Sequence, residues 1–447
     1  MSFDIQKSTQ FKVNELVIVT KGGGIDIAPI FEELSIFDSL LMPVMSGNIL
    51  ISDSVGLSSK LSFDGSESLL IDISKDANSD IANFKKAFRI YKQSDRKSEA
   101  QNEKYILHFV ADEFMYSDQQ RVNQSFNLTH SEAVEKILNN YLKVPANNLG
   151  GVYENSYGVR NITIPNLRPL EAIEWIAKRA VDINQSPNFM FFQNLLGYNF
   201  ASLSTLLTQE DVLNIKFEPK NLQNKNAIDE ISSARGYEVV SQSDSVKKTR
   251  EGVNAGQFIG FDPMTRTIAK KNISYGDHYS SMKHGNETAK FSEIKNRDGL
   301  SNSQAFDSKK TVNIFGAAKQ LSSYIKQNDP YSISKVENYE SFVFQRKAIL
   351  ANLMEKRIKV AMPGNFQLTS GLNVNLTAIG ANKSIPGEDN EDTSLSGKYL
   401  IIASRQIIGY NKHETIIEIA TTSTNKEFIE SSDFAQIKEL LEYWYGK

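Results

Sequence analysis

Cysteine is absent from this 447-residue chain, and histidine occurs only five times. The lack of cysteine excludes disulfides, thiolate metal sites and a cysteine nucleophile, and it argues against a secreted fold held by disulfides. No apolar run reaches the roughly 18 residues that a transmembrane helix needs, and Met1 to Lys7 lack the apolar core of a signal peptide. We expect a protein that is made in soluble form and has no membrane segment.

An excess of positive charge is also missing. Lysine plus arginine number 50 against 53 aspartates plus glutamates, which gives a net charge of -3. A dedicated nucleic-acid binder usually carries a basic patch, and this balance predicts none. The length suggests roughly three domains of about 150 residues, and the 40% hydrophobic content is enough to build their cores.

Motifs that carry chemistry are scarce. His278 and His284 are six residues apart beside Asp277, a spacing that fits no helix or turn chelate, so we interpret them as part of a solvated loop. Ser323 to Lys326 fits Ser-x-x-Lys but lacks the accompanying lactamase motifs. The glycines at 22 to 24 open no phosphate-binding motif and are better explained as a hairpin turn. The sequence therefore predicts no catalytic, cofactor-binding or metal-binding residue.

The first 120 residues show the period-two alternation of β-strands. Phe11 to Thr20 is expected to be a strand, the glycine turn follows it, and Ile25 to Ile30 is the answering arm. The charged stretch from Lys92 to Lys104 is expected to be the exposed loop of a long hairpin. Several short strands at this spacing predict a β-barrel or sandwich. The remaining expected strands are Gly47–Ile51, Ser68–Ile73, Phe88–Tyr91 and Tyr105–Val110.

Helices appear in the next segment, which we therefore interpret as α+β. Thr129 and Glu132 form a capping box that begins a helix, and Pro145 is expected to end it. Pro169 is typical of the first turn of a second helix. Two aromatic strands follow, at Phe189–Phe192 and Tyr198–Phe200.

The segment after residue 210 mixes strands with polar stretches. Val212–Phe217 resumes the strand pattern, and Phe258–Phe261 with Arg266–Ala269 predicts a hairpin. The region 271–330 is polar and predicts long loops. Apolar spacing then predicts a helix over Val336–Lys356, and a further amphipathic helix over Ser432–Tyr445 that docks on the body or binds a partner.

The stretch from Arg357 to Ser423 predicts an antiparallel β module. Its first strand, Arg357–Ala361, leads into a tight turn at Met362–Asn365, which we interpret as the end of a hairpin. Leu372–Leu376 is the expected return strand after Gly371. Two further strands are expected at Lys398–Ser404 and Glu414–Ala420, after a polar loop at Ala381–Leu395.

One short motif occurs twice. Ser46 to Ile51 and Ser396 to Ile401 share Ser-Gly-x-x-Leu-Ile at the start of an expected strand. Chance explains four identities in six positions at least as well as duplication does. A true duplication would place two copies of one barrel on either side of an α+β insertion.

This order of β turns and aromatic strands resembles the central baseplate hub protein of contractile-tailed bacteriophages. That family is related to the N-terminal part of type VI secretion spike proteins. Together the matching segments span most of the chain from about Phe11 to Ser423. The segments that carry the resemblance are Phe31–Phe37, Met45–Asp53, Ile164–Pro169 before the helix of Trp175, Phe189–Leu203 and Pro363–Gly371.

The resemblance implies an α+β, β-rich fold in which two tube-like antiparallel β-barrel domains flank an α+β domain, with a C-terminal helix. The boundaries we expect are residues 1–120 for the first tube-like domain and 121–210 for the α+β domain, completed by 237–335. The second tube-like domain would combine 211–236 with 336–425, and 426–447 would be the C-terminal helix.

The function implied by the resemblance is structural rather than enzymatic. Such a protein is a homotrimeric ring with pseudo-sixfold symmetry that joins a sixfold tail tube to a threefold central spike. It contacts other baseplate proteins, needs no cofactor, and lets DNA pass transiently through its lumen at genome ejection. Its place is the virion tail baseplate, after synthesis in the host cytoplasm. Two alternatives stay open: a hub of a secretion system or tailocin, and a β-rich glycan hydrolase whose acids are not paired in the sequence.

The residues singled out from the sequence are structural turns and an expected ring-contact segment. We expect proline and glycine at the turns to be needed for folding, since a positive φ there would strain other residues. The polar loop at Ala381–Leu395 is a candidate contact with a neighbouring ring. The predicted residues are Gly47, Pro363, Gly364, Gly371, Gly397 and Tyr399.

Overall fold

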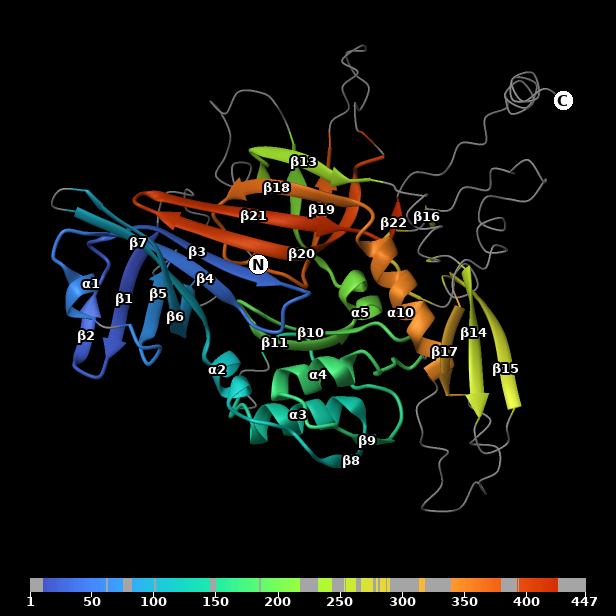
Figure 1. Cartoon of the computed structure of the whole chain (residues 1–447). Coiled ribbons are helices and arrows are strands. Elements are labelled where there is room, and N and C mark those ends of the chain that lie inside the picture. The colour runs from blue at the N-terminus through green and yellow to red at the C-terminus, as the bar shows by residue number, and fades with distance from the viewer. Residues whose placement is uncertain are drawn as a thin grey trace, which may run out of the picture.

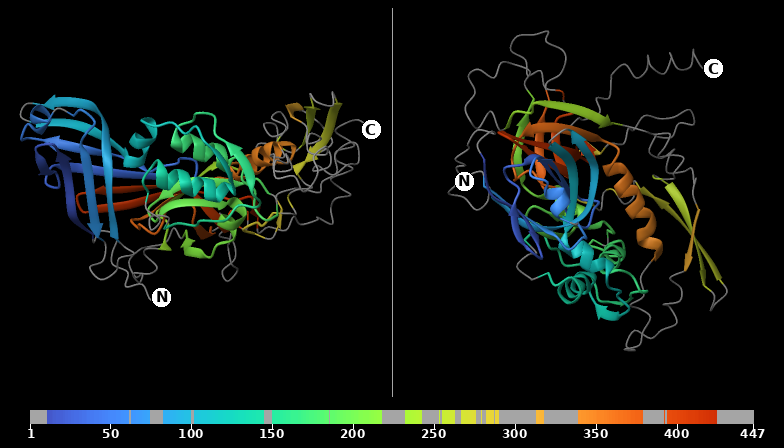
Figure 2. Two further views of the ribbon diagram at one scale, coloured as in Figure 1. Left: turned by 90° about the horizontal axis from the view of Figure 1, so that it is seen from below. Right: turned by 60° about the vertical axis from the view of Figure 1, so that its left-hand side comes forward.

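The fold is dominated by one 13-stranded sheet, with a helical module packed against it and a separate three-stranded sheet beyond (Figures 1 and 2). The expected C-terminal helix lies outside the described residues, as do most of the polar region 271–330 and most of the loop 381–395. No helix in the described part of the chain has the length and apolar character to cross a membrane. The computed structural model describes residues 11–61, 63–74, 83–99, 102–144, 150–184, 186–217, 232–242, 253, 255–262, 267–275, 279, 282–286, 288–289, 313–317, 339–378, 392 and 394–424.

The first β unit is a set of antiparallel strands paired in the order β2-β1-β5-β6-β7-β4-β3. Alternate residues point into one core, as period-two spacing requires, with Leu16, Ile36 and Phe109 among its fully buried side chains. A short helix, α1 (Leu57–Lys60), connects β4 to β5. The strands are β1 (Lys12–Thr20), β2 (Gly23–Asp26), β3 (Phe31–Ser39), β4 (Ser46–Asp53), β5 (Ser68–Ser74), β6 (Asn83–Glu99) and β7 (Asn102–Ala111).

The second β unit contains six strands paired in the order β12-β19-β20-β21-β18-β13. Its own core is built around Ile401, Ile417 and Val360. The two ends of this strand order meet where Lys216 forms a bridge with Ser233 and its carbonyl accepts from the Ala234 N–H at 3.0 Å. The strands are β12 (Asp211–Lys216), β13 (Gly236–Ser241), β18 (Arg357–Pro363), β19 (Asn373–Thr377), β20 (Gly397–Gly409) and β21 (Lys412–Ala420).

The two β units share one strand order. Without β2 the first unit has the order β1-β5-β6-β7-β4-β3, and the second has the order β12-β19-β20-β21-β18-β13. Strands at the same position in the two orders correspond: β1 to β12, β3 to β13, β4 to β18, β5 to β19, β6 to β20 and β7 to β21. The corresponding pairings are antiparallel in both units, except that β1 runs antiparallel to β5 whereas β12 runs parallel to β19. A bulge also recurs, between Ile90 and Lys92 in β6 and between Ile401 and Ala403 in β20. The chain therefore carries one strand order twice, with the direction of one strand reversed.

The repeated Ser-Gly-x-x-Leu-Ile motif does not mark this duplication. Gly47 lies in β4, whose counterpart in the second unit is β18. Gly397 instead begins β20, whose counterpart is β6. Of the two explanations left open, chance is therefore the better one, because Ser-Gly before an apolar strand is too short a pattern to fix a strand's place in a sheet.

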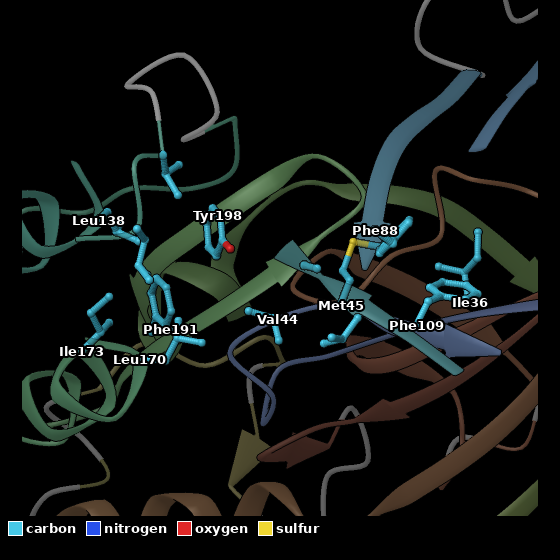
Figure 3. Close-up of a cluster of buried hydrophobic side chains, with 14 of the residues drawn as sticks. Ile36, Val44, Met45, Phe88, Phe109, Leu138, Leu170, Ile173, Phe191 and Tyr198 are labelled. Atoms are coloured by element: carbon cyan, nitrogen blue, oxygen red, sulfur yellow. The ribbon is translucent and has the colours of Figure 1, made fainter. Parts of the chain in front are cut away.

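A middle module of helices and hairpins connects the two β units. Its first long helix begins at the predicted capping box of Thr129 and Glu132, and its second has Pro169 in the first turn. Figure 3 shows Leu138 and Ile173 of these helices facing Phe191, in a core that continues into the first β unit. The elements are α2 (Asp112–Asp118), β8 (Ser125–Leu128), α3 (His130–Asn140), β9 (Arg160–Thr163), α4 (Pro169–Ala177), β10 (Phe189–Asn194), β11 (Gly197–Ser202) and α5 (Leu203–Thr208).

A smaller sheet of β14, β15 and β17 lies beside helix α10, at the end of the molecule away from the first β unit (Figure 2). β14 and β15 form the predicted hairpin, whose turn lies outside the described residues. Arg346 of α10 donates to the Phe189 carbonyl at 2.7 Å and so ties the helix to the middle module. The elements are β14 (Ala255–Asp262), β15 (Thr267–Ser274), β16 (Thr288–Ala289), β17 (Asn313–Ala317), α10 (Tyr339–Leu353) and β22 (Ser423–Thr424).

Two local predictions were wrong. β18 and β19 do not form a hairpin: β18 pairs with β13 and β21, and β19 with β12 and β20. Residues 364–372, which we call the crossing segment, connect them and bury Phe366 and Leu368. The expected loop Lys92–Lys104 is mostly strand, since β6 and β7 pair as far as Glu99 opposite Asn102. Its polar side chains made it resemble a loop, yet Arg96 forms a cross-strand ion pair with Glu103 at 3.0 Å.

The crossing segment yields a stability prediction. Gly371 has φ of +87°, and an added Cβ would lie 2.4 Å from the Phe192 ring. Gly23 has φ of +129° but no atom within 4 Å of such a Cβ. We expect Gly23→Ala to cost about 1–3 kcal/mol of backbone strain, and Gly371→Ala to cost about 1–3 kcal/mol more from overpacking. Urea unfolding of the two variants measures the difference, and equal losses would contradict the packing argument.

Candidate assembly junction

The two β units are joined by direct pairing of β20 with β3. Residues 397–400 of β20 pair with β19, and residues 403–409 of the same edge pair with β3, with Arg405 opposite Phe37. β20 has 13 residues whereas β19 has five, so the rest of that edge would otherwise present unpaired backbone groups. One continuous run of strands therefore extends from β13 through β20 and β3 to β6 (Figure 1).

The outer face of this pairing is linked by Arg405. Its guanidinium donates to Ser35 Oγ at 3.0 Å and to Glu33 Oε1 at 3.2 Å, and its Cζ lies 5.4 Å from the centre of the Phe37 ring. The side chains of Arg405 and Glu33 are both more than a third exposed, so solvent screens the ion pair. The contact fixes the register of the two strands more than it stabilises the fold.

The inner face of the same pairing holds a buried carboxyl, Asp38. The Ser370 N–H donates to Oδ1 at 2.7 Å, and the Ser404 hydroxyl donates to Oδ2 at 2.6 Å. Asp38 is only 3% exposed, and burial raises its pKa above the ordinary 3.8, against the lowering effect of these hydrogen bonds. One side chain thus links β3, β20 and the crossing segment.

The middle module is attached at the same place. Asn194 Nδ2 donates to the Ser370 carbonyl at 2.8 Å, and the Leu195 N–H donates to Thr369 Oγ1 at 3.2 Å. Gln193 Oε1 accepts from the Met45 N–H at 3.0 Å. The tip of the β10–β11 hairpin therefore contacts both β units, so all three parts of the chain meet around the crossing segment.

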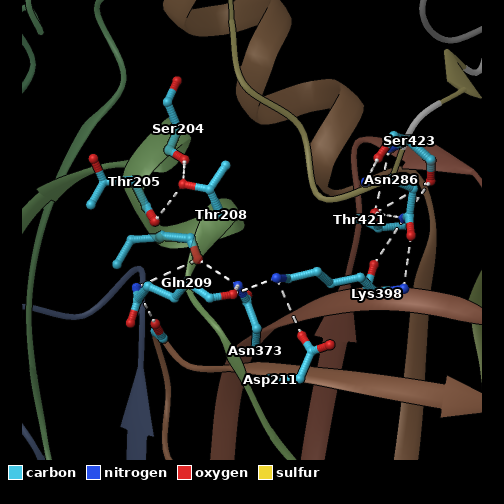
Figure 4. Close-up of polar contacts among 12 residues, drawn as sticks. Ser204, Thr205, Thr208, Gln209, Asp211, Asn286, Asn373, Lys398, Thr421 and Ser423 are labelled. Carbon is cyan, nitrogen blue, oxygen red and sulfur yellow. Dashed lines mark hydrogen bonds and ion pairs between the residues drawn. The ribbon is translucent and has the colours of Figure 1, made fainter.

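A second polar network fixes the start of β12 and β19 (Figure 4). Lys398 Nζ donates to the Gln209 carbonyl and lies 3.4 Å from Asp211 Oδ1. Asn373 Nδ2 donates to the Gln209 carbonyl as well, at 3.0 Å. Asn286 Oδ1 accepts from the Lys398 N–H at 2.8 Å. All these groups are used in joining backbone segments, which is a structural role.

Histidines in the described chain also have packing roles. His413 Nε2 lies 3.0 Å from Gln406 Oε1, and its ring is 4.6 Å from that of Phe366. His284 stacks on Tyr279 with ring centres 3.7 Å apart, so the prediction of a solvated loop was wrong at this residue. His278 lies outside the described residues. Among the residues that the structure describes, no group of three His, Cys, Asp or Glu side chains could hold a metal ion.

Two of the predicted glycines lie in close contact with the rings of neighbouring side chains. A Cβ on Gly47 would lie 2.3 Å from the Phe109 ring, and one on Gly364 would lie 2.1 Å from the His413 ring. Gly364 is therefore constrained by the histidine rather than by φ, which is positive at Gly371 but not at Gly364. Pro363 ends β18 opposite Glu414.

The other two predicted residues belong to β20. Gly397 begins the strand with φ of 136° and lies opposite Leu376 of β19. Tyr399 is buried in the core of the second β unit, and its hydroxyl donates to the Leu395 carbonyl at 2.6 Å. Contact of these residues with a neighbouring ring stays a prediction. Asp38 and Arg405 carry no motif that marks them in the sequence, although Asp38 alternates with Leu34 and Ile36 and so falls on the inward face of its strand.

No family model matches the sequence, and no curated protein matches it either. The structure, however, superposes on the crystal structure of the tail protein from Neisseria meningitidis MC58. The TM-score is 0.50 at 12% identity, over 91% of this chain and 96% of that one. The chain has the fold of a tail protein. The sequence resemblance to phage baseplate hub proteins is thereby confirmed at the level of the fold.

Two further solved structures match this chain at lower TM-scores. The 43 kDa tail protein of prophage MuSo2 from Shewanella oneidensis matches with a TM-score of 0.49 at 8% identity, over 91% of this chain and 97% of that one. The E. coli c3393 protein, described as a component of the type VI secretion system, matches with a TM-score of 0.36 at 8% identity. That match covers 94% of this chain and 78% of the other.

The buried carboxyl of this tail-protein fold gives the next prediction. Asp38→Ala leaves the Ser370 N–H and the Ser404 hydroxyl without their acceptor, and we expect a loss of about 1–3 kcal/mol in the free energy of unfolding. Asp38→Asn keeps an acceptor for Ser370 and can donate to Ser404, so it is expected to lose less. Denaturant unfolding at one pH compares the two, and an equal loss would argue against the hydrogen bonds as the cause.

The same residue predicts a pH dependence. Because the folded pKa of Asp38 is raised, its contribution to stability is fully present below the ordinary 3.8 and is lost as pH rises through the folded pKa. The stability of the wild type relative to Asp38→Asn should therefore fall as pH increases above about 4. A difference that rises with pH would show that the folded pKa is lowered instead.

Proposed function

We propose that this chain is a structural hub of a phage-type tail baseplate, and that it acts as a homotrimeric ring. The observation that carries the proposal is the fusion of two β units of one strand order, edge to edge, in a single chain. Each unit would be a tube-like β-barrel domain of the ring. The fold shared with a tail protein supports the same assignment.

Symmetry connects the duplication to the ring. β20 of one unit pairs with β3 of the other, so the contact joins two different strands of two like units and is head-to-tail. Head-to-tail contacts that repeat with a constant rotation close into rings. Three chains would supply six similar units, which lets one ring meet a sixfold tube protein on one face and a threefold spike on the other.

The outer face of the shared sheet is suited to a passage for DNA. Three of its basic side chains are matched by acids: Arg405 with Glu33, Arg357 with Glu418 at 3.0 Å, and Lys104 with Glu32 at 2.6 Å. A surface with balanced charge lacks the positive field that would hold a phosphate backbone. We propose that this face lines the lumen and that DNA contacts it only transiently.

An enzymatic role has less support. A glycan hydrolase needs two carboxyl groups facing one cleft, with their pKa values shifted apart. The buried carboxyls of the described residues instead accept hydrogen bonds from backbone N–H groups: Asp38 from Ser370 at 2.7 Å, Asp182 from Ser186 at 2.8 Å, Asp53 from Ser58 at 2.9 Å and Glu67 from Gly65 at 3.0 Å. We propose a non-enzymatic protein of the virion tail that works with the tube, the spike and other baseplate proteins.

Light scattering on the purified protein tests the proposal, alone and after addition of the spike encoded beside it. We expect three times the 50.2 kDa mass of one chain. A chain that stays monomeric in both samples would contradict the ring. Capsid and terminase genes beside this one would indicate a phage, whereas their absence would indicate a secretion system or tailocin built on the same ring.

A further inference from the structure

Each β unit contains one strand that is longer than its neighbour. In the second unit β20 extends beyond the end of β19, and β3 pairs with residues 403–409 of the edge that β19 leaves free. In the first unit the counterpart, β6, pairs with β5 only over Asn83–Arg89. From residue 91 to residue 99, β6 pairs with β7 alone among the described strands. The first unit thus presents the same kind of edge that β20 gives to β3.

The strand that corresponds to β3 is also open on one side. β3 lies between β4 and β20, and its counterpart β13 pairs with β18 over residues 236–241. β13 is the last strand of the sheet, so beyond the bridge of Ser233 to Lys216 its other edge pairs with no described strand. Val239 and Val240 on it are 36% and 44% exposed. An exposed edge strand with apolar side chains favours pairing with another chain.

We propose that β13 of one copy pairs antiparallel with residues 91–99 of β6 in the next copy. This junction would repeat between chains the contact that β3 makes with β20 inside one chain. It rests on the trimeric ring proposed above and specifies which strands close that ring. The partner is a second copy of this chain, because the internal junction already shows the fit of these two kinds of strand.

The register of the junction follows from the internal pairing. Arg405 lies opposite Phe37 there, and it also faces Ile416 of β21. The corresponding residue of β6 is Ser94. It lies two residues after Lys92, where the bulge of β6 ends, just as Arg405 lies two residues after Ala403 in β20. Ser94 faces Ile106 of β7.

The other side of the junction is placed in the same way. Phe37 faces Ser46 of β4, and Arg357 is the residue of β18 that corresponds to Ser46. Arg357 faces Ser241. Ser94 of one copy is therefore expected opposite Ser241 of the next.

The same correspondence, followed further along the two strands, brings opposite charges together. Ile407 lies opposite Ser35 in the internal junction, and their counterparts are Lys97 in β6 and Glu238 in β13. Within one chain Lys97 faces Lys104 of β7, and Lys104 Nζ is paired with Glu32 at 2.6 Å. Glu238 faces Lys359 of its own chain, and in the junction it would also lie on the free side of Lys97, where opposite charges across a strand pair are favourable.

Disulfide trapping tests the register, because the chain has no cysteine of its own. We expect Ser94→Cys with Ser241→Cys to link chains into covalent trimers on mild oxidation, seen on a non-reducing gel. The matched control is Ser98→Cys with Ser241→Cys, four residues out of register, which leaves Lys97 and Glu238 in place. Strand geometry puts that pair about 13 Å apart, beyond the reach of a disulfide. The control should link weakly.

The outcomes separate this junction from the ring itself. If the reduced variants are trimeric by light scattering but the Ser94 and Ser241 pair does not link better than the control, the junction is wrong and the ring stands. If the wild type is monomeric, both proposals fail. Linking of the predicted pair at low protein concentration, with weak linking of the control, supports both.

Charge reversal gives a second test that needs no new bond. We expect Lys97→Glu or Glu238→Lys alone to raise several-fold the protein concentration at which half of the trimer dissociates, most clearly at low salt. The combination of the two changes should restore the wild-type value. Lys178→Glu, at an exposed position in the middle module, is the control for net charge. Failure of the double variant to recover would overturn the pairing of Lys97 with Glu238.

Discussion

The need to pair the exposed edge of β20 determines most of this structure. A strand of 13 residues beside one of five leaves backbone N–H and C=O groups that must find partners. β3 satisfies them over residues 403–409 and thereby fixes one β unit against the other. The crossing segment and the β10–β11 hairpin then attach around that pairing, so the relative positions of all three parts depend on it.

The polar groups at this joint favour a specific register over maximal stability. A buried carboxyl such as Asp38 is costly unless its oxygens are bonded, and here it accepts from Ser370 and Ser404. A slip of one residue along β3 would remove Asp38 from both donors and turn its apolar residues to the other face. Buried polar contacts of this kind suit a part whose two halves must keep one geometry within a larger assembly.

Local structure could be predicted from the sequence where a local physical cause exists. The capping box at Thr129, proline in the first turn at Pro169 and the aromatic hairpin from Phe189 are examples. Pairing between distant strands could not be predicted. Period-two alternation reveals a strand without identifying its neighbour. The strand Arg357–Ala361 was therefore predicted to pair with the wrong strand. The polar ends of β6 and β7 were predicted to be a loop, although they form paired strands. Asp38 was overlooked because its donors lie more than 300 residues away in the chain.

Electron-microscope projections of the purified assembly test the account most directly, because they show symmetry and lobe number together. We predict a closed ring with threefold symmetry and six similar lobes around a central opening, in which lobes of two kinds alternate. A compact particle without an opening, or a twofold dimer, would contradict the claim that the contact inside one chain is repeated between chains.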